Sequence, residues 1–217
     1  MPHYSAILLD LDGTVTDSAP GITDTLAWTF TQLGMPVPPA EELLKYVGPP
    51  LLDSFRDLAG MTLEQREHAL EVYRVRYLDR GAYDSVLYPG MGLLVRDIAA
   101  AGIPLSLATS KPELPATLML EHFTIAEHFD LITGASEDEV RSAKADVVAE
   151  ALVRLRGIGA DLSRPIMVGD RIHDIEGAAV HGIPTIAVTW GYGDDAERAH
   201  AHAIAHDVDE LRELLGL

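Results

Sequence analysis

The segment Asp10-Leu11-Asp12-Gly13-Thr14-Val15 lies where an apolar run that begins at Ser5 reaches its first carboxylates. The run predicts a buried strand over residues 5–11, and ligands of an open parallel sheet bind beyond the carboxyl ends of its strands. Carboxylates in a strand interior would be buried at high cost. At a strand end, Asp10 and Asp12 can both face one site while Gly13 lets the backbone turn. The alternative is a solvated turn in which Asp12 caps a helix.

Outward from this segment, apolar strand candidates alternate with amphipathic helices. Further strands are expected at residues 103–109, 131–133, 165–168 and 185–188, and helices at 90–101, 112–122, 144–156 and 174–179. Most of the strand candidates are continuous apolar runs, which are typical of parallel strands that are buried on both faces. The alternation predicts an α/β fold whose core is a doubly wound, Rossmann-like parallel sheet.

One long interval breaks the alternation. Residues 16–86 contain no convincing strand pattern but several helical ones. Ile22, Leu26 and Phe30 mark one apolar helix face, and a capping-box pattern of Thr62 with Gln65 opens a long helix that ends near residue 81. We therefore expect an all-helical cap domain at 16–86, inserted into an α/β catalytic core formed by residues 1–15 and 87–217.

Composition narrows the classes of function. The 217 residues are 47% hydrophobic, include no cysteine and carry a formal net charge of -18. Thiolate chemistry and cysteine-based zinc sites are thereby excluded, and nucleic acid polymers and anionic membranes are poor partners. No signal peptide is indicated and no apolar stretch reaches the ~18 residues of a membrane span, so a cytoplasmic protein of unknown oligomeric state is expected. An anionic substrate would need a local positive site.

Two later segments carry polar residues at matching positions. The second core strand ends in Ala108-Thr109-Ser110-Lys111, where hydroxyls and the free N–H groups of a helix start suit a phosphate. An ordinary Ser or Thr helix cap would give the same pattern. Lys144 lies at another predicted helix start, where the helix dipole disfavours a cation. A functional lysine explains that position, and a plain surface lysine is the alternative.

A third segment adds carboxylates. The fourth core strand ends in Val168-Gly169-Asp170, and Asp174 follows four residues later as a ligand, as a helix N-cap or as both. Mg²⁺ usually takes one or two carboxylates together with water and substrate phosphate. His173 leaves zinc or iron open, but a carboxylate-dominated cluster suits magnesium better. In a doubly wound sheet all these strand ends can converge on one edge, so one shared site explains them better than unrelated turns do.

Together these segments resemble the haloacid dehalogenase superfamily, and specifically its phosphatases. Asp10-Leu11-Asp12-Gly13-Thr14 looks like its first motif, Thr109-Ser110 like its second, Lys144 like its third, and Gly169-Asp170 through Asp174 like its fourth. The helical insertion and residues 46–51, 109–113 and 190–193 resemble the phosphoglycolate phosphatase-like and 5′-nucleotidase-like branch. The resemblance covers nearly the whole chain and shows no departure at the catalytic positions.

The resemblance implies a magnesium-dependent phosphatase, a hydrolase of phosphoric monoesters. Asp10 would attack phosphorus and form an aspartyl phosphate, while Asp12 would act as general acid and then general base. The roles that it implies for the other residues are metal binding by Asp10, Asp170 and the backbone carbonyl of Asp12, phosphate binding by Thr109, Ser110 and Lys144, and support by Asp174 and Gly13.

The substrate is expected to be a small phosphorylated metabolite, phosphoglycolate first, with a 5′-nucleotide or a sugar phosphate as alternatives. Asp12 argues against a dehalogenase because a departing halide needs no proton, whereas a phosphomutase would use the same core. A catalytically silent regulator that binds a phosphate ligand would show a damaged motif, and none is visible. Residues expected to select the substrate are Tyr46, Gly48 and Arg56 in the cap and Arg171 in the core. Helix packing or a solvated face is the alternative for Tyr46 and Arg56.

Overall fold

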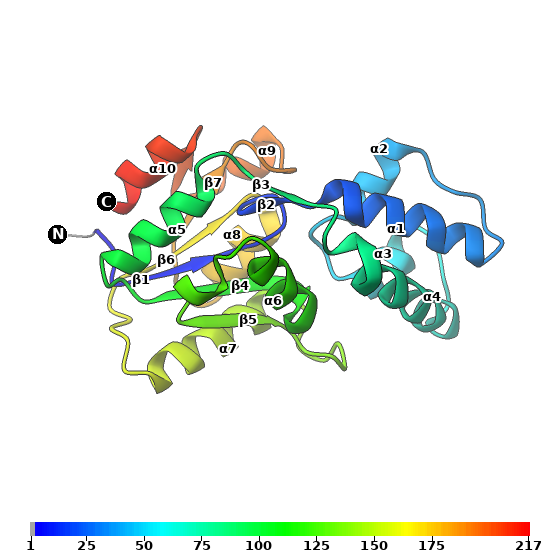
Figure 1. The fold of residues 1–217 in the computed structure, drawn as a ribbon, viewed down its shortest axis with the longest axis horizontal. Helices are drawn as coiled ribbons and strands as arrows, with labels where there is room; N and C mark the ends of the chain where they lie inside the picture. The colour runs from blue at the N-terminus through cyan, green and yellow to red at the C-terminus, as the bar shows by residue number, and fades with distance from the viewer. Residues whose placement is uncertain (1–2) are drawn as a thin grey trace.

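The computed structural model describes residues 3–217, and its centre is a six-stranded parallel sheet (Figure 1). The strands are β1 (Ala6–Leu9), β4 (Leu105–Pro112), β5 (Leu131–Ala135), β6 (Pro165–Gly169), β7 (Thr185–Val188) and β8 (Ala203–Ala205). Their order is β5-β4-β1-β6-β7-β8, so β1 lies between β4 and β6 with parallel pairing on both sides. The predicted parallel sheet is confirmed.

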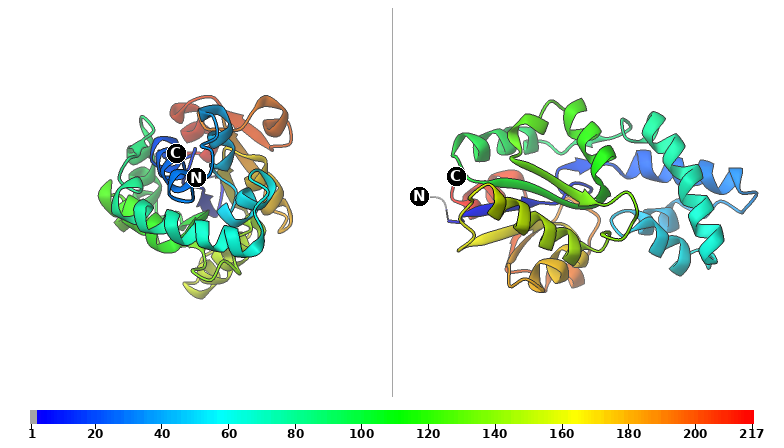
Figure 2. Two further views of the ribbon diagram at one scale, coloured as in Figure 1. Left: turned by 90° about the vertical axis from the view of Figure 1, so that its right-hand side faces the viewer. Right: turned by 90° about the horizontal axis from the view of Figure 1, so that it is seen from below.

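Helices cover both faces of this sheet (Figure 2). On one face, Ile7 and Leu9 of β1 share a core with α5 (Met91–Ala100), α6 (Glu113–His122) and α10 (Val208–Leu215). On the other face, Ala6 and Leu8 pack in a second core with α7 (Lys144–Gly157) and α8 (Ile172–Ala179). Because successive strand residues point to opposite faces, the continuous apolar run of β1 supplies both cores.

A second, two-stranded sheet interrupts the interval that was expected to hold helices alone. β2 (Thr16–Asp17) pairs in antiparallel fashion with β3 (Val86–Leu87). The expectation of no strand in residues 16–86 was therefore wrong at both ends. Each strand is two residues long, too short for an alternating pattern to be visible. The ribbon holds the entry and exit of the helical segment side by side.

Between β2 and β3 the chain forms a helical unit at the far end of the molecule from both termini (Figures 1 and 2). Its elements are α1 (Ala19–Gln32), α2 (Ala40–Leu43), η1 (Leu44–Tyr46), α3 (Leu51–Asp57), α4 (Leu63–Arg76) and the π-helical turn η2 (Tyr77–Gly81). The capping box of Thr62 and Gln65 at the start of α4 is confirmed. Below, this helical unit is called the cap.

The cap has an aromatic centre. Phe30, Tyr46 and Phe55 meet with ring centroids 5.9–6.3 Å apart. All three rings are buried, and they belong to the same hydrophobic core as one face of the sheet. Because edge-to-face aromatic pairs add to the free energy of ordinary apolar burial, this cluster fixes the cap helices against one another.

Some elements of the core have no counterpart in the sequence-based prediction. These are β8, α10, the short helix α9 (Asp195–Arg198) and the turn η3 (Ala126–His128). β8 has three residues on the edge of the sheet, and only Ala205 in it is buried. An edge strand this short gives little hydrophobic signal. None of the helices in residues 3–217 is long and apolar enough to cross a membrane.

Candidate active site

The candidate site lies at the carboxyl ends of β1, β4 and β6. Asp10 directly follows β1 and Asp170 directly follows β6, while Thr109 and Ser110 lie within β4. The turn after β1 depends on Gly13, whose φ is +86°. A Cβ atom there would lie 2.3 Å from Oδ2 of Asp170, so both the backbone conformation and the close approach require glycine.

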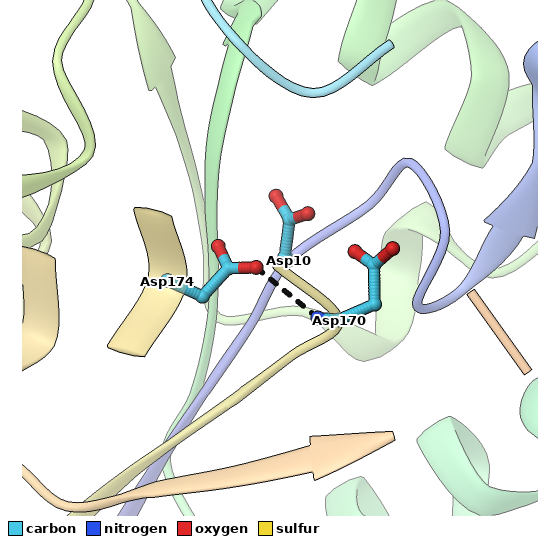
Figure 3. Close-up of side chains that lie close together, drawn as sticks. All are labelled: Asp10, Asp170 and Asp174. Atoms are coloured by element: carbon cyan, nitrogen blue, oxygen red, sulfur yellow. Dashed lines mark hydrogen bonds between the residues drawn. The ribbon is translucent and has the colours of Figure 1, made fainter. Parts of the chain in front are cut away.

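Three buried carboxylates meet at this sheet edge (Figure 3). One oxygen from each of Asp10, Asp170 and Asp174 lies within 4.8 Å of the others. The cluster is held by backbone donors: the Asp170 N–H donates to Oδ2 of Asp174 at 3.1 Å, and the Tyr192 N–H donates to Oδ2 of Asp170 at 2.6 Å. Carboxylate oxygens gathered in this way can hold a divalent metal ion.

Lys144 supplies the cation that contacts this cluster. Its Nζ lies 2.6 Å from Oδ1 of Asp10 and 2.7 Å from Oδ1 of Asp174, and it donates to the carbonyl of Ala108 at 3.0 Å. Burial alone would lower the pKa of Lys144, but the attraction of Asp10 and Asp174 outweighs it, and the pKa is raised. Lys144 is therefore a fixed positive charge, although the dipole of α7 opposes it.

The single positive charge of Lys144 does not balance the negative charges of three ionised carboxylates. Burial raises the pKa of Asp10 to about 7; Lys144 opposes this rise and Asp174 adds to it. Burial, followed by repulsion from Asp174 and Asp10, holds the pKa of Asp170 well above its usual range. The protein therefore favours protons on these groups unless another cation neutralises them. A hard divalent cation with oxygen ligands fits this donor set.

Asp12 lies apart from the three-carboxylate cluster. Its Oδ2 is 3.0 Å from Nζ of Lys111, and its Oδ1 accepts a hydrogen bond from the Ser18 hydroxyl. Lys111 also donates to the Tyr77 hydroxyl at 2.8 Å and lies 4.7 Å from the centroid of the Tyr77 ring. Asp12 is thus joined through Lys111 to a cap residue.

The contacts of Asp12 were not foreseen in the sequence. Lys111 is adjacent to the predicted phosphate-binding hydroxyls and almost fully buried, which is unusual for lysine. Its partner Tyr77 is 34 residues away in the cap, and Ser18 lies on the entry to the cap. No local periodicity links these residues, so sequence patterns carried no signal for them beyond the lysine beside the motif.

Asp174 has a different place in α8 from the predicted one. The helix begins at Ile172 with Arg171 as its N-cap residue, and Asp174 is the third residue of the helix. Oδ2 of Asp174 accepts from the N–H groups of Asp170 and Arg171, at 3.1 and 3.0 Å. The N-cap alternative for Asp174 is therefore contradicted, and Oδ1 of Asp174 faces Lys144.

Thr109 and Ser110 differ in exposure. Thr109 is buried, and its hydroxyl accepts a hydrogen bond from the Lys111 N–H at 3.2 Å. Ser110 lines both of two neighbouring cavities between cap and core. The first cavity, of about 180 Å³, is lined by Asp12, and the second, of about 500 Å³, by Lys144. Ser110 therefore stands where both cavities meet the candidate site.

The residues expected to select the substrate occupy different surroundings. Tyr46 lines the first cavity but is buried in the aromatic centre of the cap. Gly48, at φ +105°, also lines this cavity and lies against Arg171. The Arg171 guanidinium donates to the cap carbonyl of Val47 at 3.1 Å, which ties core to cap. Arg56 is exposed, pairs with neighbouring aspartates and lines the second cavity.

Comparison with known proteins agrees with this geometry. Residues 7–188 match the family of haloacid dehalogenase-like hydrolases. The tyrosine-protein kinase PtkA of Mycobacterium tuberculosis H37Rv is 43% identical over 215 residues, which cover 97% of this chain and 72% of that protein. The 5′-nucleotidase of Pseudomonas aeruginosa PAO1 is 35% identical, with 98% and 96% covered. The phosphoglycolate phosphatase of Caulobacter vibrioides is 31% identical, with 93% and 86% covered.

A solved structure agrees over the whole chain. The crystal structure of a predicted phosphatase from Clostridium acetobutylicum superposes with a TM-score of 0.90 at 36% sequence identity, covering 99% of both chains. The resemblance noted from the sequence motifs is confirmed, and so is the α/β fold class.

Proposed function

Since the chain belongs to the haloacid dehalogenase-like hydrolase family and is a phosphatase, we propose that it cleaves small phosphate monoesters through a covalent intermediate on Asp10. One observation carries the proposal: Lys144 bridges Asp10 and Asp174 at 2.6 and 2.7 Å, beside the carboxylate of Asp170. A nucleophilic carboxylate can meet a phosphate dianion only where cations offset their repulsion. Lys144 provides one such cation in contact with the nucleophile.

In the first half-reaction an oxygen of Asp10 attacks phosphorus, and the bond between phosphorus and the ester oxygen breaks. Asp12 gives its proton to the departing oxygen, so the product leaves as an alcohol. In the second half-reaction Asp12 accepts a proton from water, and that water attacks phosphorus. The bond between phosphorus and Asp10 then breaks, which releases inorganic phosphate and restores the Asp10 carboxylate and the protonated Asp12. Lys144, Ser110 and the Thr109 hydroxyl are proposed to hold the phosphoryl oxygens.

We propose Mg²⁺ as the metal because the donors at the site are carboxylates. Asp10 and Asp170 would hold the ion with the backbone carbonyl of Asp12, and Asp174 would orient Lys144 or complete the carboxylate set. When bound, the ion supplies charge neutralisation for the phosphate and the nucleophile. The raised pKa of Asp10 and of Asp170 supports this assignment, since both report negative charge that the protein itself does not balance.

Trapping of the intermediate tests the nucleophile. Borohydride reduction during turnover of p-nitrophenyl phosphate with Mg²⁺ should convert residue 10 to homoserine, which peptide mass spectrometry detects. Asp10→Asn should abolish phosphate release, whereas Asp79→Asn, at an exposed aspartate of the cap, should leave it unchanged. Homoserine at another position, or substantial turnover by Asp10→Asn, would overturn the assignment. EDTA should remove activity and Mg²⁺ restore it.

A second candidate function is favoured by one observation, the 43% identity to a protein named tyrosine-protein kinase. In that reaction a tyrosine hydroxyl, rather than water, would receive the phosphoryl group, and a nucleoside triphosphate would donate it. Incubation with γ-labelled ATP and Mg²⁺ distinguishes the two functions. Alkali-stable label on tyrosine indicates a kinase, while free phosphate, or hydroxylamine-labile label on Asp10, indicates a phosphatase.

A further inference from the structure

The first cavity lies between cap and core and touches the proposed general acid. We call it the leaving-group chamber: the cavity of about 180 Å³ whose lining includes Asp12, Leu70, Tyr73, Tyr77 and Leu114. Asp12 must reach the oxygen that departs from phosphorus, so the rest of the leaving group has to lie in the space beside Asp12. The lining of the second cavity includes Lys144 but not Asp12, so that cavity is not the place for this group.

The chamber walls are aromatic and aliphatic. Tyr73 and Tyr77 stack with ring centroids 5.2 Å apart and planes inclined by 13°. Leu70, Leu114 and Ile22 add aliphatic surface from both lobes. The exposed area of the lining is mostly apolar. Such walls favour a flat apolar ligand, because its burial releases water from both surfaces.

Both cations that line the chamber already have carboxylate partners. Lys111 pairs with Asp12 at 3.0 Å, and Arg74 pairs with Glu139 at 2.5 Å. Among its described residues, the lining contains these two cations and three carboxylates, the third being Glu137. A leaving group with its own carboxylate, as in phosphoglycolate, would be buried there without a free cation to offset its charge.

The volume indicates a single ring. A dry, apolar protein cavity of about 150 Å³ accommodates benzene, and the chamber is of similar size. We propose that the leaving-group chamber takes a neutral leaving group with one planar ring, attached either through a methylene, as in benzyl phosphate, or through ribose, as in a pyrimidine 5′-nucleotide. This substrate class rests on the proposed function, and it differs from the phosphoglycolate that the motifs led us to expect first.

Initial-rate measurements with Mg²⁺ test the proposal, using benzyl phosphate, uridine 5′-monophosphate and phosphoglycolate. All three release an unactivated alkoxide, so differences in kcat/KM report how the leaving group is bound. One ring substrate should exceed phosphoglycolate by at least about tenfold, because the carboxylate is buried without a partner. The better of the two ring substrates identifies the linkage. Equal or higher kcat/KM for phosphoglycolate would overturn the proposal.

A variant pair locates the effect in the chamber. Leu114→Arg adds a third cation to the lining, at a half-exposed position. It should lower the ratio of kcat/KM for the ring substrate over phosphoglycolate by at least about tenfold. Leu93→Arg, at an exposed leucine of α5 outside the chamber, should leave the ratio unchanged. A ratio that is unaffected by Leu114→Arg would overturn the proposal, whereas absence of turnover of p-nitrophenyl phosphate by the wild type would instead defeat the proposed function.

Discussion

Replacing the proposed nucleophile should stabilise the metal-free protein. Asp10 is buried beside Asp170 and Asp174, with Lys144 as the cation in contact with it. Burial raises the pKa of Asp10 from 3.8 to about 7, with Lys144 acting against the rise and Asp174 with it. The folded protein therefore tolerates the neutral side chain better than the charged one. Asp10→Asn keeps the shape of the side chain and removes the charge.

The sign and size of the effect follow from proton linkage. Between pH 4 and 7 the folded state binds more protons at Asp10 than the unfolded state does, so the free energy of unfolding falls as pH rises through this window. Above pH 7 the loss is complete, and the difference between 3.8 and about 7 corresponds to about 4 kcal/mol. Asp10→Asn has no charge at residue 10, so its free energy of unfolding does not fall in this way. It should gain up to about 4 kcal/mol at pH 8 and less than about 2 kcal/mol at pH 5.

Urea unfolding in EDTA, followed by the fluorescence of Trp28 and Trp190, measures this gain at both pH values. Asp79→Asn is the matched control and should show no gain at either pH. Added Mg²⁺ should raise the stability of the wild type more than that of Asp10→Asn, because the ion offsets the same charge. A variant that is less stable than the wild type at pH 8 in EDTA, or a gain equal at pH 5 and pH 8, would refute the reasoning.

Three further substitutions test the surroundings of the nucleophile. Gly13→Ala should destabilise the protein by more than about 2 kcal/mol in urea unfolding, because the position has φ +86° and a Cβ would lie 2.3 Å from the carboxylate of Asp170; an unchanged midpoint would contradict this. Lys111→Met should lower kcat by about tenfold to a hundredfold with little change in KM, since Asp12 loses the cation paired with it at 3.0 Å; an unchanged kcat would show that the pair has no catalytic effect. Arg171→Ala should raise KM more than it lowers kcat, because the guanidinium ties the core to a cap carbonyl at 3.1 Å; steady-state kinetics in which kcat alone falls would argue against a role in cap closure.

Most strands of the core could be predicted because each is marked by a local apolar run in the sequence. The runs at 165–168 and 185–188 match β6 (Pro165–Gly169) and β7 (Thr185–Val188) within a residue, since both strands are buried and bounded by polar turns. Parallel pairing places the carboxyl ends of β1 and β6 at one edge, which is why Asp10 and Asp170 could be grouped from the strand pattern. β2 and β3 were not predicted, because a strand of two residues is too short to show an alternation of apolar and polar side chains.

The cap side of the site was not predictable, because it depends on how two lobes dock. Lys111 and Tyr77 contact each other across the interface, and no sequence pattern links the two residues. Tyr46 is the opposite case, a cap residue for which the sequence did suggest a role. Its place in a motif-like loop suggested substrate selection, but Tyr46 is buried and its ring packs against Phe30 and Phe55, which agrees with the packing alternative. Its contribution to substrate choice stays a prediction.

The protein carries a net charge of -18, which disfavours the binding of an anionic substrate. The charged side chains at the candidate site add to this repulsion. The proposed nucleophile, the general acid and their two neighbours are all aspartates, and two lysines contact them: Asp10, Asp12, Asp170 and Asp174 against Lys111 and Lys144. Both lysines are already paired with aspartates. Before any phosphate arrives, the formal charge of the site is therefore -2 with all four aspartates ionised, and -1 while Asp12 carries the proton that it donates. Two like charges 4 Å apart repel by about 4 kcal/mol at an effective dielectric constant of 20. Lysine alone therefore cannot make the site attractive to a phosphate dianion. One divalent cation removes this negative excess in either state, and this is the electrostatic reason why we expect catalysis to require the metal.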